Sequence, residues 1–361
     1  MPVATMQSTI LRARPLSRLL RGYSLIEFMI AITLGMMILA GVTTVFLRNS
    51  ATRSGLERGF QLNDNGLHAL QVLSDELRNA GYLADFDPKH LPTTAVMPNL
   101  CASTFTELAG ALPFAIQGID NISTALACLP DARTASDVVS VRRVATCPGG
   151  SLGCETPPTG TAFLQPSRCN STTELASQNR QDHYRFETET AKLTLLGGDC
   201  TSLAPYYQYR THLYYVANND KAQDGIPTLK RAELVPGGFA IVSVAQGIEQ
   251  LQIEYGIDAG ALAGTTLTGA PGTFSANPAI YKGCAGTVCS TYWRNAVAAR
   301  VHLLVRATTP TMGHVESKTY LLGNNADGTD NFYTPPTKDA YKRRVFSATA
   351  RLNNVAGRNT P

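Results

Sequence analysis

The hydrophobic pattern divides the chain into a long helix near its start and a strand-rich body behind it. From Tyr23 to Leu47 the chain is almost uniformly apolar, and Glu27 is the only acidic or basic side chain among these 25 residues. About 20 consecutive apolar residues suffice for a helix to cross a bilayer. We therefore predict a transmembrane helix over residues 23–47.

After residue 47 the pattern becomes one-sided, with apolar residues recurring at steps of three, four or seven and polar residues between them. No proline occurs between Tyr23 and Tyr82, and Gly81 is a suitable C-terminal stop. The pattern predicts one helix over 23–80, whose amphipathic continuation, residues 48–81 with the stop, packs on a sheet. The face expected to pack is formed by Leu56, Phe60, Leu67, Leu70, Leu73 and Leu77.

Residues 82–361 alternate between β-prone runs and turn-rich stretches. Residues 83–130 and 145–169 read as loop regions tied by cysteines, and a hairpin is expected between 206–217 and 228–235. One long helix followed by a run of strands predicts an α+β fold with a mostly antiparallel sheet. The predicted strands are 138–144, 184–189, 192–196, 206–217, 228–235, 238–244, 248–257, 297–307 and 343–352.

The charge of the chain is concentrated at its start. The chain has 31 Lys and Arg against 27 Asp and Glu, and residues 1–22 hold four of the basic side chains and none of the acidic ones, which leaves 27 against 27 after residue 22. Positive charges before an apolar helix hold that end in the cytoplasm, so the body is expected across the membrane. A body without net charge gives no reason to expect nucleic acid as a partner. The four basic residues are Arg12, Arg14, Arg18 and Arg21.

All eight cysteines follow the apolar run, on the side of the membrane where disulfides form. Eight cysteines allow 105 connectivities, and we favour nearest neighbours. A zinc site is the alternative, but there is no CxxC pair and no histidine close to two cysteines. The favoured pairs are Cys101 with Cys128, Cys147 with Cys154, Cys169 with Cys200, and Cys284 with Cys289.

An acidic residue inside a membrane segment costs roughly 2.5 to 3.5 kcal/mol, so Glu27 is expected to have a partner. The stretch around it, residues 21–28, reads RGYSLIEF and resembles the class III signal of type IV prepilins, with tyrosine where phenylalanine is commonest. The resemblance implies that a membrane peptidase removes the leader, residues 1–22, by cleaving between Gly22 and Tyr23, and methylates the new amine of Tyr23. Glu27 would then pair with that amine in a neighbouring subunit.

Two other interpretations of the N-terminal segment stay open. One is a plain signal anchor that tolerates an acidic residue. The other is a removable secretory signal, although the apolar core of such a signal usually has 7 to 15 residues.

Four later segments resemble one branch of the same superfamily, the PilW minor pilins. They are 77–82 (LRNAGY), 247–256 (GIEQLQIEYG), 299–306 (ARVHLLVR) and 343–347 (RRVFS), while 351–354 (RLNN) departs from the more usual Leu-Arg-Asn ending. The resemblance implies a type IV pilin-like fold with a periplasmic or extracellular β-rich head, residues 82–361. It also implies a single-pass protein of the bacterial inner membrane that later reaches the cell-surface pilus.

The function implied by this resemblance is that of a low-abundance pilin, which primes or joins the pilus near its tip and supports adhesion and twitching motility. Its implied partners are other minor and major pilins, the prepilin peptidase, the inner-membrane assembly platform and a large tip adhesin. Two alternatives remain: a minor pseudopilin of a type II secretion system, and a membrane-anchored binding or hydrolytic module.

No enzyme motif is present: the sequence lacks GxSxG, HExxH, a P-loop and a GxGxxG that follows a strand. We therefore predict neither an enzyme nor a cofactor. The polar stretch 324–331 contains Asn325, Asp327 and Asp330 beside a glycine, a pattern that suits calcium. It lacks the glutamate that closes an EF-hand loop, and a simple turn explains it equally well.

Overall fold

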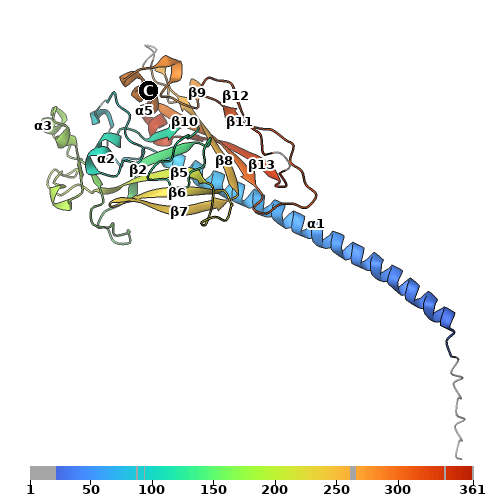
Figure 1. Ribbon diagram of the computed structural model, residues 1–361. Coiled ribbons are helices and arrows are strands. Elements are labelled where there is room, and N and C mark those ends of the chain that lie inside the picture. Colours follow the sequence, from blue (N-terminus) through green and yellow to red (C-terminus); the bar gives the residue numbers. More distant parts are fainter. Residues whose placement is uncertain (1–21, 87, 93, 261–265, 337–338, 360–361) are drawn as a thin grey trace, which may run out of the picture. The chain divides into compact units, whose positions relative to one another are not determined.

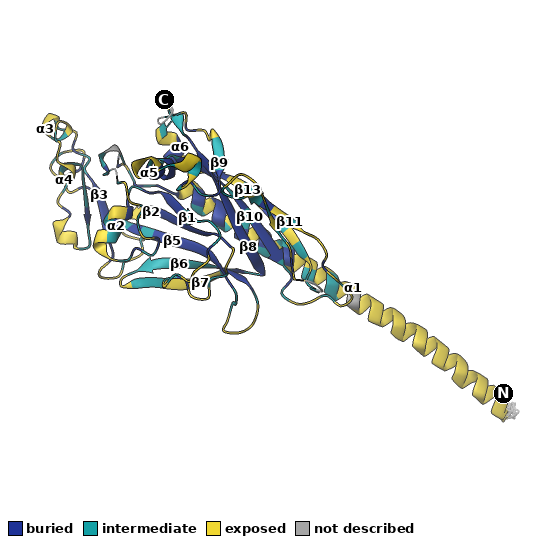
Figure 2. Ribbon diagram, turned by 45° about the horizontal axis from the view of Figure 1, so that its top comes forward, coloured by how far each residue is buried: buried dark blue, intermediate teal, exposed yellow. Residues whose placement is uncertain are grey.

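The computed structural model describes residues 22–86, 88–92, 94–260, 266–336 and 339–359, and it divides into two compact units, residues 1–56 and 57–361. Helix α1 (Leu25–Asn79) begins in the first unit and ends in the second, within two residues of the predicted bounds. In the first unit the helix exposes its apolar side chains, as the colouring in Figure 2 shows. The leader, residues 1–21, lies outside the described residues.

The second unit contains the end of α1 and a strand-rich body (Figure 1). Its other helices are η1 (Pro88–His90), α2 (Phe105–Ala111), α3 (Thr172–Leu175), α4 (Arg180–His183), η2 (Thr190–Lys192), η4 (Tyr281–Gly283), α5 (Thr287–Arg294) and α6 (Asn353–Asn359). Its strands are β1 (Ile116–Ile119), β2 (Val138–Pro148), β3 (Phe163–Pro166), β4 (Tyr184–Glu187), β5 (Tyr207–Ala217), β6 (Thr228–Val235), β7 (Gly238–Gln246), β8 (Ile248–Ile257), β9 (Thr273–Ser275), β10 (Ala296–Arg306), β11 (Tyr320–Asn324), β12 (Asp330–Tyr333) and β13 (Arg343–Arg351).

The described strands form two main sheets and a hairpin, and all the ladders between them are antiparallel. The seven-stranded sheet has the order β1-β2-β5-β3-β4, with β6 on β5 and β7 on β6; the four-stranded sheet has the order β13-β10-β8-β9. The chain changes sheets at Gly247, between β7 and β8. Its φ is +77°, and a Cβ there would lie 2.5 Å from the carbonyl oxygen of Arg306, so only glycine fits this crossing. The α+β, antiparallel prediction is confirmed, with two main sheets where one was expected.

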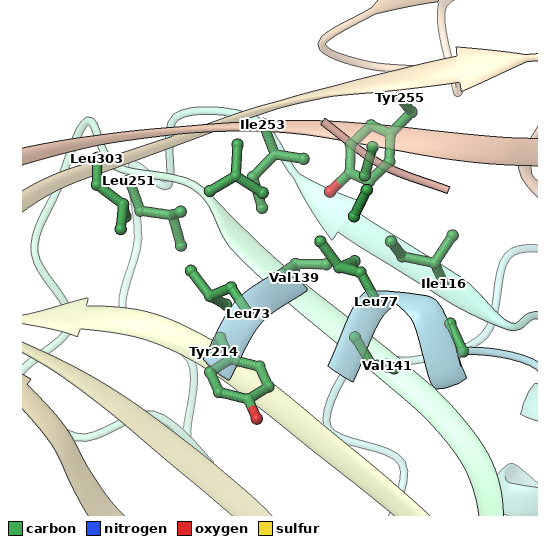
Figure 3. Close-up of a cluster of buried hydrophobic side chains, with 14 of the residues drawn as sticks. Leu73, Leu77, Ile116, Val139, Val141, Tyr214, Leu251, Ile253, Tyr255 and Leu303 are labelled. Atoms are coloured by element: carbon green, nitrogen blue, oxygen red, sulfur yellow. The ribbon is translucent and has the colours of Figure 1, made fainter. Parts of the chain in front are cut away.

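The main core lies where the end of α1 meets both sheets. Leu73 and Leu77 are almost fully buried, and they belong to one cluster with residues of both sheets. Figure 3 shows them among Val139, Val141 and Tyr214 of the seven-stranded sheet and Leu251, Ile253 and Leu303 of the four-stranded sheet.

Half of the predicted packing face of the helix is wrong. Leu56, Phe60 and Leu67 are 59, 70 and 59% exposed, whereas Leu62 and Ala69 are buried with Leu73 and Leu77. At 100° per residue the three exposed side chains lie about a third of a turn away from the buried ones. The apolar residues that recur at steps of three, four and seven therefore lie on two neighbouring faces of the helix, and the prediction treated these as a single packing face.

The predicted strand at 192–196 is also wrong. Thr190–Lys192 is a short helix, and Leu196 makes only an isolated bridge with Leu203. The Gln165 side chain holds this segment instead: its Oε1 accepts from Leu195 N at 3.0 Å and its Nε2 donates to the Leu195 carbonyl at 3.3 Å. The side-chain amide of Gln165 therefore makes the backbone hydrogen bonds that a neighbouring strand would make.

Several short elements lie inside regions predicted as loops. Helix α2 and strand β1 occur within 83–130, and β3 occurs within 145–169. Strands of three to five residues show too few alternations for a period to be recognised. Helix α2 did leave a local signal, because Thr104 and Glu107 form a capping box at its start.

Candidate functional site

The N-terminal end of α1 is fixed by a reciprocal pair of hydrogen bonds. The backbone N–H of Ser24 donates to Glu27 Oε2 at 2.9 Å, and the backbone N–H of Glu27 donates to Ser24 Oγ at 3.2 Å. This is a capping box, which satisfies two N–H groups that a helix start leaves without partners. This box is not among the features predicted above, although a serine followed three residues later by glutamate is its recognised sequence signal.

Gly22 and Tyr23 precede the helix in non-helical backbone, and the Tyr23 side chain is 90% exposed. The predicted cleavage point thus lies one residue before the capping box. The four leader arginines, Arg12, Arg14, Arg18 and Arg21, lie outside the described residues.

Helix α1 is long and apolar enough to cross a membrane, with a mean hydropathy of 2.3 over an 18-residue window and none of that window buried. Its threonines do not leave hydroxyl donors unpaired in this apolar stretch. Thr33, Thr43 and Thr44 donate to backbone carbonyls three or four residues earlier, at 2.8 to 2.9 Å. This arrangement suits a helix surrounded by hydrocarbon, where no water replaces a missing partner.

A largely buried ionic cluster joins the end of α1 to the seven-stranded sheet. Glu76 Oε1 accepts from Arg143 Nε of β2 at 2.8 Å and lies 3.1 Å from His212 Nδ1 of β5, and the Tyr214 hydroxyl lies 3.4 Å from Glu76 Oε2. Burial opposes ionisation of Glu76, but the hydrogen bonds and charges of His212 and Arg143 outweigh it and lower the pKa of Glu76 to about 2. No local sequence pattern indicates this cluster, because its members are 67 and 136 residues apart.

The C-terminal end of α1 is held by segments from far along the chain. Gly81 follows the helix with a φ of +72°, and its N–H donates to the Arg142 carbonyl at 2.9 Å. Asn354 at the start of α6 donates through Nδ2 to the carbonyls of Asn79 and Ala80 at 3.3 and 3.2 Å. The last turn of the helix is therefore tied to both the sheet and the C-terminal helix.

The eight cysteines form four disulfides, and each joins nearest neighbours along the chain, the pairing favoured from the sequence. The bonds are Cys101–Cys128, Cys147–Cys154, Cys169–Cys200 and Cys284–Cys289. All of them lie in the second unit.

Unreduced protein from cells is expected to react with a thiol-alkylating reagent at none of its cysteines, and reduced protein at all eight. The loops closed by Cys101–Cys128 and Cys169–Cys200 have sequence separations of 27 and 31. Loops of that length give about 3 to 4 kcal/mol each, and the two short loops about 2. Mass spectrometry counts the labels, and four or more labels before reduction would contradict the disulfide framework.

The calcium candidate forms the turn between β11 and β12. Asn325 Nδ2 donates to the Thr329 hydroxyl at 3.1 Å and to the Asp330 carbonyl at 3.2 Å, and Asp327 Oδ1 accepts from the Thr329 N–H at 3.0 Å. These polar atoms are therefore engaged within the turn itself. Among the described residues, no group of three or more His, Cys, Asp or Glu side chains is placed to hold a metal ion.

Three residues on neighbouring strands have the types of a hydrolase triad. His302 Nδ1 lies 2.8 Å from Ser347 Oγ, and His302 Nε2 lies 3.2 Å from Glu254 Oε2. The same oxygen accepts from Arg300 at 3.1 Å, and Gly323 of β11 lies against the imidazole, where an added Cβ would come 2.8 Å from Nε2. The ring nitrogens face the serine and the acid in the opposite order from the serine protease triad. We interpret the group as a hydrogen-bonded chain across the sheet.

The body matches one protein family. The model of the family described as type IV pilus-assembly protein W (PilW) matches residues 213–354, from within β5 to the start of α6. None of the curated proteins compared with the chain matches it. Among solved structures, a type IV-like pilin from Thermus thermophilus is similar, with 12% identity, a TM-score of 0.30, and coverage of 82% of this chain and 97% of that chain.

Three of the four segments that resemble PilW minor pilins lie within the matched residues. They form β8, β10 and β13 of the four-stranded sheet. By this match, residues 213–354 of the chain are similar to the PilW family of type IV pilus-assembly proteins.

Proposed function

We propose that the chain is a minor pilin that primes or joins type IV pilus assembly near the tip, and so supports adhesion and twitching motility. Residues 1–22 are a leader that prepilin peptidase removes, and the new amine of Tyr23 is methylated. Residues 23–47 hold the protein in the inner membrane and later lie in the filament core. Residues 48–81 continue the helix into the head, residues 82–361, which has a structural and not a catalytic role.

The observation that carries the proposal is the position of Glu27 at the start of the apolar helix. The capping box directs its carboxylate back toward Ser24, one residue after the predicted new N-terminus. A carboxylate has about four acceptor positions, so the hydrogen bond from Ser24 leaves it able to bind an ammonium group as well. The capping box thus supports a role for Glu27 in pairing with the amine of Tyr23 in an adjacent subunit.

Processing gives the first test of this proposal. Protein recovered from pili is expected to begin at Tyr23 and to carry a methyl group on its amine, which mass spectrometry of the N-terminal peptide detects. Gly22→Leu should stop cleavage and Gly22→Ala should slow it. Gly41→Leu, a bulky substitution deep in the apolar segment with open space around the Cα, is the matched control and should be cleaved normally. Finding residues 1–22 intact in assembled protein would contradict the proposal.

A minor pseudopilin of a type II secretion system would share the leader, the helix and a similar head. Deletion of the gene separates the two functions. If the chain is a minor pilin, the deletion is expected to reduce piliation and twitching while secreted enzymes stay at wild-type level. If it is a pseudopilin, the deletion would reduce secretion and leave piliation and twitching at wild-type level.

A further inference from the structure

One face of the seven-stranded sheet carries a small group of buried polar side chains, which we call the polar patch. It consists of Ser140 and Arg142 of β2 and of Tyr209 and Thr211 of β5, and each is 2% exposed or less. Arg142 lies opposite Thr211 in the antiparallel register. Because residues two apart on a strand share a face, all four side chains point to the same side of the sheet.

The polar patch interrupts an otherwise apolar face. Val144, on one side of the patch, belongs to one buried hydrophobic cluster, and Val138, on the other side, belongs to a second. Leu108 of α2 is part of the first cluster and Leu100 is part of the second. The segment that contains these two leucines therefore covers this face of the sheet and keeps bulk water away from the patch.

Arg142 is charged but has only uncharged hydrogen-bond partners. Its Nη2 donates to Gln117 Oε1 at 2.9 Å and its Nη1 donates to the Phe114 carbonyl at 3.5 Å, while its Nε has no partner. Among the described residues no carboxylate forms an ion pair with it, and Glu107, the acidic residue of α2, is engaged in the capping box of that helix. An arginine stays protonated inside a protein, and a buried charge without a counter-ion is strongly unfavourable.

The three hydroxyls of the polar patch are also unpartnered. Ser140 Oγ, Tyr209 Oη and Thr211 Oγ1 are almost inaccessible to solvent, and at hydrogen-bond geometry none has a partner among the described residues. Burial raises the pKa of the Tyr209 phenol, while the charge of Arg142 and the hydroxyl of Thr211 lower it, so the three side chains lie near one another. A guanidinium N–H and the hydroxyls are thus grouped together, and each can donate a hydrogen bond.

A cavity of about 200 Å³ adjoins the polar patch at Tyr209. Its other walls are Leu108 of α2, residues 160–162 and the turn at 235–237 that follows β6, and no acidic residue lines it. Tyr209 therefore belongs to both the cavity and the patch. A small ion that enters the cavity has only to pass Tyr209 to reach Arg142.

We propose that the polar patch binds a small monovalent anion of the size of chloride, held by Arg142 Nε and the hydroxyls of Tyr209 and Thr211. The anion supplies the charge that Arg142 lacks and accepts hydrogen bonds from donors that have no other partner. Ordered water would satisfy the hydroxyls but would leave the guanidinium without a counter-ion. A larger oxyanion such as sulfate would need an opening that these inaccessible atoms do not offer.

The anion would also stabilise the attachment of the covering segment to the sheet. Phe114 and Gln117, the partners of Arg142, come from the chain just after α2, and Gln117 Nε2 donates to the Pro98 carbonyl at 2.9 Å. Residues 98–117 are thus tied to the sheet through Arg142. The inference goes beyond the proposed function and depends only on the fold of the head.

Calorimetric melting of the full-length protein in detergent tests the proposal. At pH 7 and constant ionic strength, chloride replaces gluconate, an anion too large for the site. A ligand that binds only the folded protein raises the melting temperature with the logarithm of its concentration. The expected shift is roughly 2 to 5 °C for each tenfold rise in chloride above half-saturation, and bromide should act similarly.

Conservative variants connect this shift to the polar patch. Tyr209→Phe and Thr211→Val each remove one hydroxyl, keep the side-chain shape, and should raise the chloride concentration needed for a given shift about tenfold. Arg142→Met removes the charge and should abolish the shift. The matched control is Tyr215→Phe on the same face of β5, because its hydroxyl donates to the Pro130 carbonyl at 3.2 Å. This variant should keep the full chloride shift.

Crystals of the full-length protein grown in bromide locate the ion directly. One peak of anomalous scattering is expected in contact with Arg142 Nε. A peak there without a melting shift in solution would show binding at crystal concentration only, and would overturn the proposal.

Two results of the melting experiment would also overturn it. Melting temperatures that follow ionic strength but not the identity of the anion would show that the patch holds water only. A chloride shift that Arg142→Met and Tyr209→Phe both retain in full would place the anion elsewhere. If Arg142→Met does not fold, Tyr209→Phe alone decides this second point, because it leaves the charge and the packing of the patch in place.

Discussion

Glu27→Gln is expected to leave the protein in the inner membrane at wild-type level and to remove it from sheared pili. Without the charge the lone helix inserts at least as well, because an acidic residue in a membrane segment is costly. In an assembled bundle the amine of the neighbouring Tyr23 would lose its partner in apolar surroundings. Removing one member of a buried ion pair costs about 3 to 5 kcal/mol, or roughly a thousandfold in partitioning at 1.4 kcal/mol per tenfold. Immunoblots of membrane and sheared-pilus fractions measure both pools.

The capping box allows the charge of Glu27 to be separated from its local role. Glutamine at this position can still accept the hydrogen bond from Ser24 N, because either Glu or Gln completes a capping box. Ser24→Ala removes the other half of the box and keeps the charge. If assembly requires the pairing of Glu27 with the amine, Glu27→Gln and Glu27→Ala should both fail to enter pili. Ser24→Ala should still assemble, because losing a helix cap costs only about 1 kcal/mol.

Two outcomes would count against the pairing of Glu27 with the amine. Wild-type amounts of Glu27→Gln in sheared pili would refute it directly. Failure of Ser24→Ala and Glu27→Ala with normal assembly of Glu27→Gln would show that the start of the helix, and not the charge, is what assembly requires.

The elements with long, regular patterns could be predicted from sequence. The predicted bounds of β6 and β8 agree with the structure at both ends, and those of α1 agree within two residues. Such segments repeat one period often enough that local preference and the final fold agree. The nearest-neighbour cysteine pairs could also be chosen, because they close short loops between segments that are close along the chain.

The parts that depend on distant contacts could not be predicted. The packed face of α1 is defined by residues far along the chain, such as Phe346, which lies so close to Gly66 that a Cβ there would meet its ring at 2.5 Å. Glu76 reads as an ordinary helix-surface residue, and its partners Arg143 and His212 are 67 and 136 residues away. In each case the deciding neighbour is remote in sequence.

Glu76→Gln is expected to destabilise the head by about 3 kcal/mol at pH 7, because it leaves Arg143 and His212 without an anionic partner in a buried position. For a domain of this size the loss should lower the melting temperature by roughly 5 to 10 °C. Trp293 reports the transition: it is the single tryptophan, it is 2% exposed, and its ring lies 4.7 Å from that of Tyr255. Fluorescence of the full-length protein in detergent therefore follows unfolding of the core.

Asp75→Asn is the matched control, because Asp75 is the preceding helix residue and its ion pair with Arg78 is about half exposed on both sides. Exposed pairs contribute at most about 1 kcal/mol, so this variant should melt close to wild type.

The pH dependence supplies a second check on Glu76. Its pKa is lowered from 4.5 to about 2 in the folded head, so its contribution is complete above pH 4.5 and is lost as the pH falls toward 2. The gap in stability between wild type and Glu76→Gln should therefore narrow across this window, by about 3 kcal/mol in all. A gap that stays constant between pH 7 and pH 2 would mean that the glutamate acts through packing, and that the ionic cluster with Arg143 and His212 does not hold the helix to the sheet.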